Sequence, residues 1–353
     1  MRRRCSRRGY VLALTVFAMV VILGAAALTM DVGLLTAAAQ RAQEVADAAA
    51  HGAGMRLPDA AAGRAVAWSL ISANNAADSG LQAVVQCYVT GAEGVVTAGP
   101  DVVFYGAWDT VPGFGMLGQY ARAVRVTAHV PVQFTFAKVL GFEGANPTRS
   151  CTVVRMPLGG VPICPMWISY GQPYLYGQQQ QLLMADDPAC ANIPGSFGWL
   201  NPPSGQSNTF LELLRGYNLS EQLLTDNWVQ IGDTVNAYTG LSVGQWAKAL
   251  HTSPDGLGRM DRSEWAPWTH DTFEDYHNDN PRILIIPLVE YLGGTGSGAQ
   301  FLIHKFGAFY VESINSKKTP YSINGRFIQY TTPGAGGDPF ADDTGIWTVN
   351  MVG

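Results

Sequence analysis

The sequence is poor in charged residues and lacks the residue spacings that build common metal sites. Only 14% of its 353 residues are charged, and no Cys-x-x-Cys or His-x-x-x-His spacing occurs. Such spacings are typical of zinc sites. No acidic residue precedes Asp31, and only one apolar run is long enough to cross a membrane. We therefore expect no metal, no cofactor and a single membrane span.

Basic residues are scarce beyond the N-terminus. The chain has 22 lysines and arginines, and five of them are Arg2, Arg3, Arg4, Arg7 and Arg8. The remaining 17 stand against 27 acidic residues, so the chain after this tail carries a net charge of −10. Nucleic-acid binding relies on clustered basic residues. The charge balance therefore argues against a nucleic-acid partner.

Residues 10–30 contain no charge and lie between the five arginines and Asp31. At about 1.5 Å of rise per residue, a helix over this run covers a hydrocarbon core of about 30 Å. Basic residues next to a span stay on the cytoplasmic side. We expect residues 1–9 in the cytoplasm, residues 10–30 in the lipid bilayer, and the rest of the chain exported.

A cleaved signal is the alternative to a retained anchor. Ala25, Ala26 and Ala27 satisfy the small-residue requirement of signal peptidase, and SRRGYVL at 6–12 loosely resembles a twin-arginine signal. The apolar run is, however, longer than the apolar region of about 7–15 residues in a usual signal peptide. It also continues without a turn into an Ala-rich segment. We therefore favour the retained anchor.

The apolar run leads into a predicted helix over 34–50. Small and aliphatic residues repeat on one face at three- and four-residue steps: Leu35, Ala38, Ala42, Val45 and Ala49. We expect one rod of about 40 residues that ends near Gly52 and Gly54. The Ala face can dock on the protein's own sheet, or on another helix because small residues allow close approach. Both alternatives remain open.

The rest of the chain predicts an α+β fold with antiparallel sheets. Residues 31–156 are expected to form a helix-plus-sheet domain, with a second helix over 60–72 and strands over 81–90, 101–105, 123–130, 132–140 and 150–156. PLGGVPICP (157–165) is interpreted as a linker, and 157–353 as a β-rich exported domain. Its expected strands are 228–231, 233–238, 282–290, 300–313 and 326–331, with a helix over 243–251.

Four cysteines lie beyond the membrane run: Cys87, Cys151, Cys164 and Cys190. An even number suits disulfides in an oxidising compartment, and sequence alone allows three pairings. We favour Cys87–Cys151 and Cys164–Cys190, because each pair stays inside one proposed domain. Cys5 precedes the span and is expected to stay reduced in the cytoplasm.

Two patterns invite a chemical interpretation. GLSVG (240–244) matches the Gly-x-Ser-x-Gly nucleophile elbow around Ser242, but the alternating βα units of a hydrolase are absent. A turn before the 243–251 helix is the simpler interpretation. Acidic residues gather at 269–280 and 338–343, where they could hold Ca²⁺, but EF-hand spacing is missing. Solvated loops are the simpler interpretation there, and we expect no enzymatic activity.

The order of these features resembles the TadE/TadG-like class of Tad/Flp pilus-assembly proteins. The resemblance rests on RRGYVLALTVFAMVVILGAAALTMDVGLLTAAAQRAQEVADAAAHGA, on VVFYGAWD (102–109), and on ARAVRVTAHVPVQFTFAKVLG (121–141). It implies a non-enzymatic structural or assembly component of a tight-adherence pilus in the bacterial cell membrane. It also implies partners among other pilus components, met through the N-terminal helix. A membrane-anchored adhesin and an exported serine hydrolase are the alternatives.

Processing separates this chain from true prepilins. Cleavage by a prepilin peptidase after Gly9 would leave Tyr10 at the N-terminus and Leu14 at the fifth position, where prepilins usually have glutamate. Without that carboxylate, burying the new amine in a packed helix bundle would be costly. We therefore expect the basic tail to be kept and the protein to stay anchored rather than polymerise as a major subunit.

Overall fold

The computed structural model describes residues 7–77, 101–171, 174–186, 196–205, 207–239, 243–251, 254–342 and 345–352. The chain divides into two compact units. Unit 1 comprises residues 1–116, 122–154 and 351–353, and unit 2 comprises residues 117–121 and 155–350. Helices and strands both occur throughout, which agrees with the predicted α+β class.

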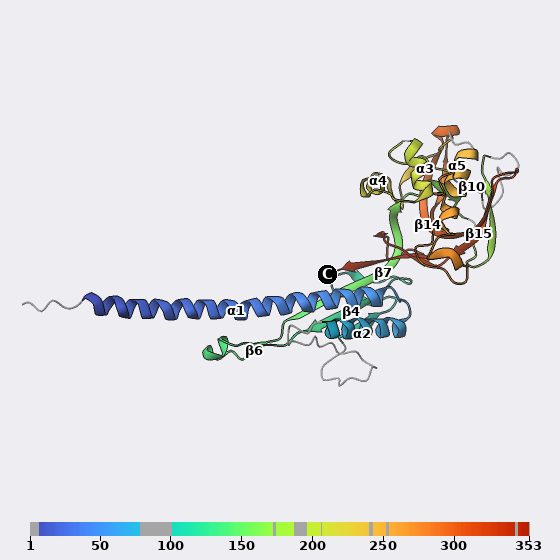
Figure 1. Ribbon diagram of the computed structural model, residues 1–353. Helices are drawn as coiled ribbons and strands as arrows, with labels where there is room; N and C mark the ends of the chain where they lie inside the picture. Colours follow the sequence, from blue (N-terminus) through green and yellow to red (C-terminus); the bar gives the residue numbers. More distant parts are fainter. Residues whose placement is uncertain are drawn as a thin grey trace, which may run out of the picture. The chain divides into compact units, whose positions relative to one another are not determined.

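Unit 1 begins with one unbroken helix of 48 residues, α1 (Arg7–Gly54), which Figure 1 shows in blue. It ends where the predicted rod ends. The second helix, α2 (Ala60–Ala77), follows a short turn. Asp59 caps it, because its Oδ1 accepts hydrogen bonds from the backbone N–H groups of Ala61 and Ala62, both at 3.0 Å. These N–H groups have no partner within the helix, so the carboxylate satisfies them.

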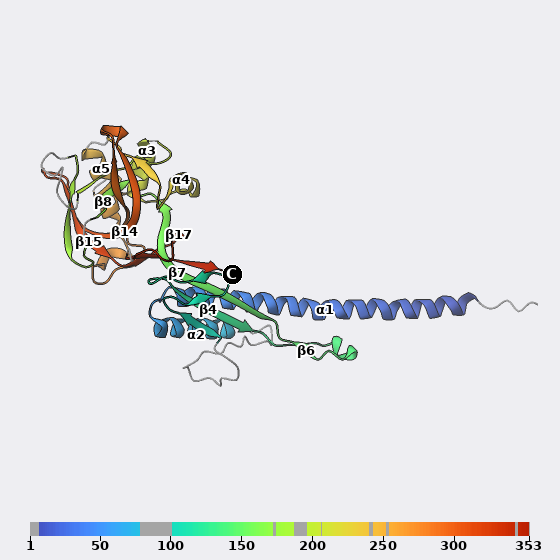
Figure 2. The same cartoon turned by 180° about the vertical axis from the view of Figure 1, so that it is seen from behind.

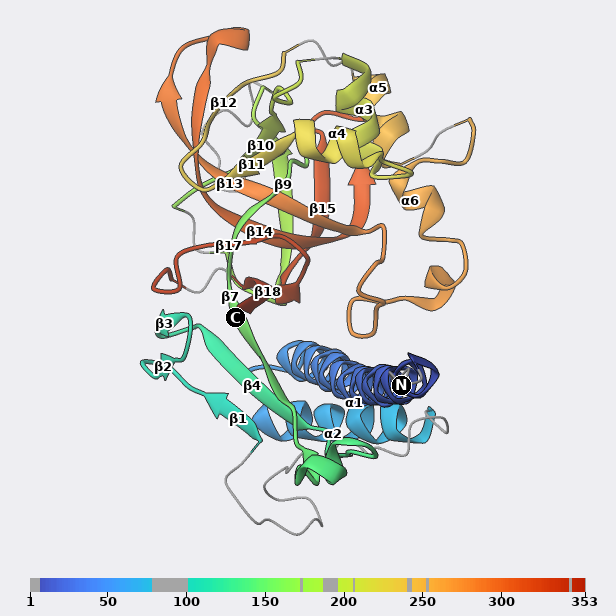
Figure 3. The same ribbon diagram turned by 90° about the vertical axis from the view of Figure 1, so that its left-hand side faces the viewer.

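The Ala-rich face of α1 packs on α2 and on strand β4 of the same unit (Figure 3). Ala38, Ala42, Val45 and Ala49 are each at most 1% exposed. Their small side chains let the backbones of neighbouring elements come close. Of the two alternatives left open by the sequence, the structure therefore shows docking on the protein's own sheet and second helix.

The sheet of unit 1 contains β1 (Val102–Tyr105), β4 (Arg122–His129) and the first part of β7 (Thr148–Pro162). β1 and β4 are antiparallel. Val124, Val126 and Ala128 are fully buried in β4 with half-buried residues between them, as the alternation over 123–130 predicts. Four short strands and one 3-10 helix complete the unit: β2 (Thr110–Val111), β3 (Gly115–Met116), β5 (Val132–Gln133), β6 (Gly144–Ala145) and η1 (Ala137–Leu140).

The expected linker at 157–165 is wrong for most of its length, because β7 continues through it to Pro162. The chain passes from unit 1 to unit 2 within this strand, between Val154 and Arg155. β11 (Trp228–Gln230) and β17 (Ala335–Gly336) both pair with its second part. A Cβ on Gly159 would lie 2.5 Å from the Cα of Gly337. The glycine therefore permits close approach of strands rather than flexibility.

Unit 2 is built around a closed barrel of six strands. In pairing order these are β14 (Gln300–Asn315), β13 (Ile283–Gly293), β8 (Met166–Ser169), β10 (Ser196–Trp199), β9 (Gln179–Met184) and β15 (Ser322–Ile328), which pairs back onto β14. β8 with β13 and β9 with β10 are parallel, so the expectation of purely antiparallel sheets is wrong at these two pairs. Parallel neighbours need a crossover connection, which residue alternation does not reveal.

Aromatic side chains form much of the core of unit 2. Trp199 of β10 packs edge-on against Phe210 at 5.8 Å between ring centroids, and its ring lies 5.7 Å from that of Trp246. These two rings come from α3 (Ser207–Arg215) and α5 (Val243–Leu250). The remaining elements of unit 2 are α4 (Glu221–Asp226), α6 (Arg259–Arg262), η2 (Trp268–His270), η3 (Gly296–Gly298), β12 (Thr234–Asn236), β16 (Tyr330–Thr331) and β18 (Ile346–Val352).

Candidate functional site

The first half of α1 has almost no cover from the rest of the chain. The large apolar side chains between Val11 and Met30 whose burial the structure describes are 48% to 71% exposed. This helix is long and apolar enough to span a membrane. Arg7 and Arg8 form its first turn, whereas Arg2, Arg3 and Arg4 lie outside the described residues. The coarser prediction, a single N-terminal helix able to span a bilayer, is therefore confirmed.

Asp31 marks the point where α1 changes from exposed to buried. It is only 2% exposed, and its carboxylate accepts three hydrogen bonds from backbone N–H groups. Oδ1 accepts from Thr135 at 2.9 Å, and Oδ2 accepts from Phe136 at 2.9 Å and from Ala137 at 2.6 Å. The sequence predicts Asp31 only as the residue that closes the membrane run, so its role as an acceptor is a finding of the structure.

The three donors belong to the start of η1, which lies between β5 and β6. Phe136 occupies the cap position of η1 and supplies no side-chain hydrogen bond. The side chain of Asp31, more than 100 residues earlier in the chain, accepts the hydrogen bonds that a capping side chain would accept. Burial raises the pKa of this carboxyl group, but the three donors outweigh burial and hold its pKa below the ordinary value of 3.8. Asp31 is therefore ionised at neutral pH.

The hairpin built by β5, η1 and β6 extends along α1 toward its apolar half (Figure 2). Its arms pair through Val132 with Ala145 and through Gln133 with Gly144. We call residues 134–143 the hairpin tip. Gly141 has φ of 89° there, a left-handed conformation that favours glycine. The strand predicted over 132–140 is wrong after Gln133, because β5 ends there and η1 follows.

Three apolar side chains of the hairpin tip are exposed. Val139 is 89% exposed, Phe142 63% and Phe136 42%. The sequence does not single them out, because Val132, Phe134 and Phe136 alternate with Gln133 and Thr135, as in a half-buried strand. The available signal was the pair Gly141 and Gly144 within four residues of each other, which indicates a turn rather than a continuing strand.

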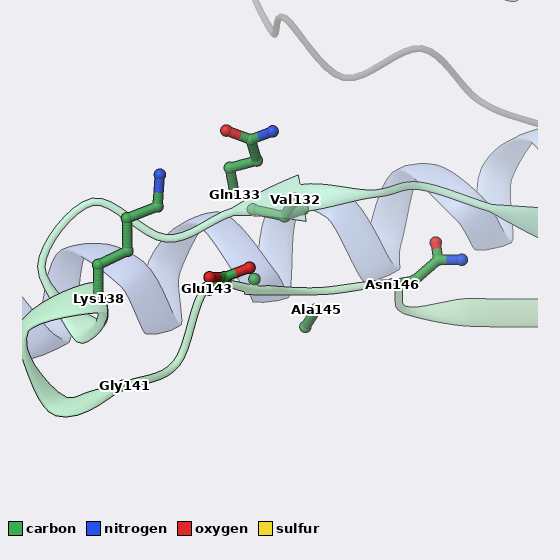
Figure 4. A pocket seen from close by; sticks show the side chains of 8 residues that line it. Val132, Gln133, Lys138, Gly141, Glu143, Ala145 and Asn146 are labelled. Carbon is green, nitrogen blue, oxygen red and sulfur yellow. The ribbon is translucent and has the colours of Figure 1, made fainter.

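An open hollow of about 740 Å³ lies between the arms of this hairpin (Figure 4). Lys138 and Glu143 contribute its two charged side chains. The other residues that line it are Val132, Gln133, Gly141, Gly144, Ala145 and Asn146. None of these lining residues is a histidine, cysteine or serine.

The predicted acidic segment at 269–280 holds its own loop together. Asp271 accepts hydrogen bonds from the backbone N–H of His277 at 2.9 Å and from the side-chain amide of Asn280 at 2.6 Å, and His277 Nδ1 lies 2.7 Å from its Oδ1. In the part of the chain that the structure describes, no group of three or more His, Cys, Asp or Glu side chains is placed to hold a metal ion. The second acidic segment includes Asp343, which lies outside the described residues, as does Ser242.

Two of the four predicted disulfide cysteines are described. Cys151 and Cys164 are buried free thiols. Cys87 and Cys190 lie outside the described residues, so both pairings stay predictions. Burial and the neighbouring Asp47 raise the pKa of Cys151 to about 12. A thiol with so high a pKa is not a nucleophile at neutral pH.

Unit 2 contains a mainly apolar pocket of about 420 Å³ that includes Cys164 and Arg259. Burial raises the pKa of Cys164 to about 11, although the charge of Arg259 acts in the opposite direction. Arg259 donates from Nε to the carbonyl of Leu214 at 2.7 Å and from Nη2 to that of Leu213 at 3.3 Å. A cation on the last carbonyls of α3 stabilises the helix end. Both polar groups therefore have structural roles.

No protein-family model, no curated protein and no solved structure matches this chain.

Proposed function

We propose that this chain is a membrane-anchored, non-enzymatic component of a tight-adherence (Tad/Flp-type) pilus system. In this proposal the N-terminus is cytoplasmic, residues 10–30 cross the bacterial cell membrane, and units 1 and 2 lie on its other side. The observation that carries the proposal is the division of α1 at Asp31. Before this residue the helix is apolar and uncovered, and after it the helix is packed into unit 1.

Physical chemistry supports the anchor. Apolar surface left in water costs about 25 cal/mol per Å², and the side chains from Val11 to Met30 are mostly exposed. The residues after Asp31 bury small side chains against α2 and β4. In this proposal the N-terminal part of α1 is surrounded by lipid, and its C-terminal part is packed into a folded domain.

The assignment to a pilus system rests on the resemblance carried most strongly by residues 7–53 and also by 102–109 and 121–141. The first range coincides with α1 and the last with β4 and the hairpin beyond it. Since the Ala face of α1 is already buried in unit 1, we place contacts with other pilus components on the bilayer segment 10–30. Helices associate there through close packing of side chains rather than through the hydrophobic effect.

Deletion of the gene in the bacterium that encodes it tests the proposal. We expect loss of surface pili and restoration of pili by the full chain supplied in trans. Normal pili with weaker attachment to surfaces would instead support the adhesin alternative. Loss of a hydrolytic activity in Ser242→Ala, with pili unchanged, would support the hydrolase.

A matched variant separates anchoring from partner contacts. In it, residues 10–30 are replaced by an unrelated membrane-spanning helix while Arg7, Arg8 and Asp31 are kept. If the segment meets other pilus components, this variant reaches the membrane but fails to restore pili. Full restoration would show that residues 10–30 act only as an anchor.

A further inference from the structure

We propose that the hairpin tip is a second membrane contact, in which Phe136, Val139 and Phe142 enter the interfacial layer of the outer leaflet beside the point where α1 leaves the bilayer. This inference rests on the membrane span of the proposed function and adds a site to it. The ligand is the lipid surface itself.

The exposed side chains are the first step. Single exposed apolar residues are ordinary on protein surfaces, but here three large ones lie within seven residues at the end of one hairpin. Val139 is 89% exposed, more than any other large apolar side chain described. A protruding tip of this composition is unfavourable in water and favourable where water gives way to lipid.

The depth of the tip is the second step. A helix over residues 10–30 is about 30 Å long, which matches the hydrocarbon core, so Asp31 lies at its boundary. The N–H groups of Thr135, Phe136 and Ala137 are within 2.6 to 2.9 Å of the Asp31 carboxylate. The start of η1 is therefore held at the level of the boundary.

The chemistry of the tip is the third step. Lys138 lies between Phe136 and Val139 and is exposed. At an interface a lysine keeps its apolar stem against the acyl region while its ammonium group reaches lipid phosphates. Two aromatic rings, one aliphatic side chain and one cation favour an interfacial position. Glu143, also exposed in the tip, is placed on the water side of the headgroups in this proposal. If residues 10–30 span the bilayer, the lipid headgroups lie at the same depth as the hairpin tip.

Depth-dependent fluorescence quenching tests the proposal on the full chain. A small environment-sensitive fluorescent amino acid is placed at Val139 in protein reconstituted into phosphatidylcholine and phosphatidylglycerol nanodiscs with one chain per disc. Nitroxide quenchers are carried by the lipid headgroup or by the acyl chain. We expect a blue shift and strong quenching by headgroup and shallow acyl quenchers at Val139.

Three other positions serve as matched controls. Gln133 lies on an exposed arm of the same hairpin and should be quenched less than Val139. Thr110 is exposed in the separate β2–β3 hairpin of unit 1 and should not be quenched by lipid. Val20 lies inside the apolar half of α1 and should be quenched by deep acyl quenchers.

The outcomes distinguish the two proposals. Quenching at Val20 without quenching at Val139 overturns the second contact and leaves the anchor in place. Absence of quenching at Val20 overturns the anchor itself. Protection of Val139 from aqueous iodide only when two chains share a disc means that a second copy covers the tip, which also overturns the inference.

A second variant tests the tether. Asp31→Asn keeps the shape of the side chain but removes its charge, and its amide cannot accept three N–H groups through two equivalent oxygens. We expect loss of quenching at Val139 with unchanged quenching at Val20. An unchanged Val139 signal would contradict the role of Asp31 in fixing the depth of the tip.

Discussion

The two halves of α1 belong to one helix, but they are packed differently. Residues 11–30 carry no charge, whereas residues 31–54 include Asp31, Arg41, Glu44 and Asp47. Residues 11–30 carry large side chains such as Phe17 and Ile22, which are 71% and 66% exposed. Residues 31–54 turn alanines toward the protein, and Ala42, Ala46 and Ala53 are fully buried. Large side chains provide area for lipid contact, whereas small ones let a helix approach a sheet. Residue size, more than hydrophobicity, therefore distinguishes the two environments.

A charge placed in each half should produce the largest difference between them. Val20→Asp puts a carboxylate at the middle of the apolar half, at a cost of about 2.5–3.5 kcal/mol for membrane insertion. Gln40→Asp puts the same group on the exposed side of the other half. Resistance to carbonate extraction should be lost in the first variant and kept in the second. Equal extraction of both would refute the division at Asp31.

Replacing an alanine by a larger residue should be harmful in the second half of α1 and harmless in the first. Ala42 has no exposed surface, so Ala42→Leu overpacks unit 1 and should lower its free energy of unfolding by about 1–3 kcal/mol. Ala26→Leu adds the same atoms to the exposed half and should have little effect. Denaturant unfolding in detergent, followed by circular dichroism, measures both. Comparable destabilisation by the two variants would mean that residues before Asp31 are packed as well.

The residue between the halves should respond to pH in a defined direction. The pKa of Asp31 is lowered in the folded protein, so its stabilising effect is complete above its ordinary pKa and is lost as pH falls through the lowered folded value. Hydrogen exchange at the amides of Thr135, Phe136 and Ala137 should therefore be slow at neutral pH. It should accelerate in Asp31→Asn. Unchanged exchange in that variant would show that the carboxylate does not hold the tip.

A second buried carboxylate, that of Asp271, should give the smallest pH effect and serves as a control for Asp31. Hydrogen bonding to Asp271 raises the pKa of His277 above its ordinary value of 6.5. The contribution of this pair is complete below the ordinary histidine pKa and is lost as pH rises through the raised folded value. NMR titration of His277 should show the raised pKa, and Asp271→Asn should return it toward 6.5. Hydrogen exchange at the three amides that donate to Asp31 should not change in that variant.

Periodicity in the sequence was sufficient for the longest regular elements of unit 1. The apolar run, the Ala face of α1 and the alternation of β4 all follow from which residues recur at which spacing, and the structure has them at those places. The barrel of unit 2 was not predictable in this way, because its closure depends on which distant strands pair. The same holds for β7, where Gly159 permits the close approach of another strand instead of ending the strand.

The site near Asp31 shows the same limit. The sequence predicts a charge at the end of the membrane run but not its partners, because Thr135 lies 104 residues away and donates through its backbone. Every residue except proline has a backbone N–H, so residue type does not reveal such a donor. The exposed tip was likewise hidden, since the alternation of Phe134 and Phe136 with Gln133 and Thr135 predicts a strand that the structure replaces by η1.

One consequence follows from the continuity of α1 across Asp31. The helix has no break between the proposed membrane segment and the part packed in unit 1. A rotation of one part about the helix axis is therefore transmitted to the other. Each residue of an α-helix advances about 1.5 Å and turns about 100°. A single alanine inserted between Gly24 and Met30 would therefore twist the intramembrane face by that angle relative to unit 1. If residues 10–30 cross a bilayer, as we propose, a rotation of that segment reaches unit 1 through the unbroken helix.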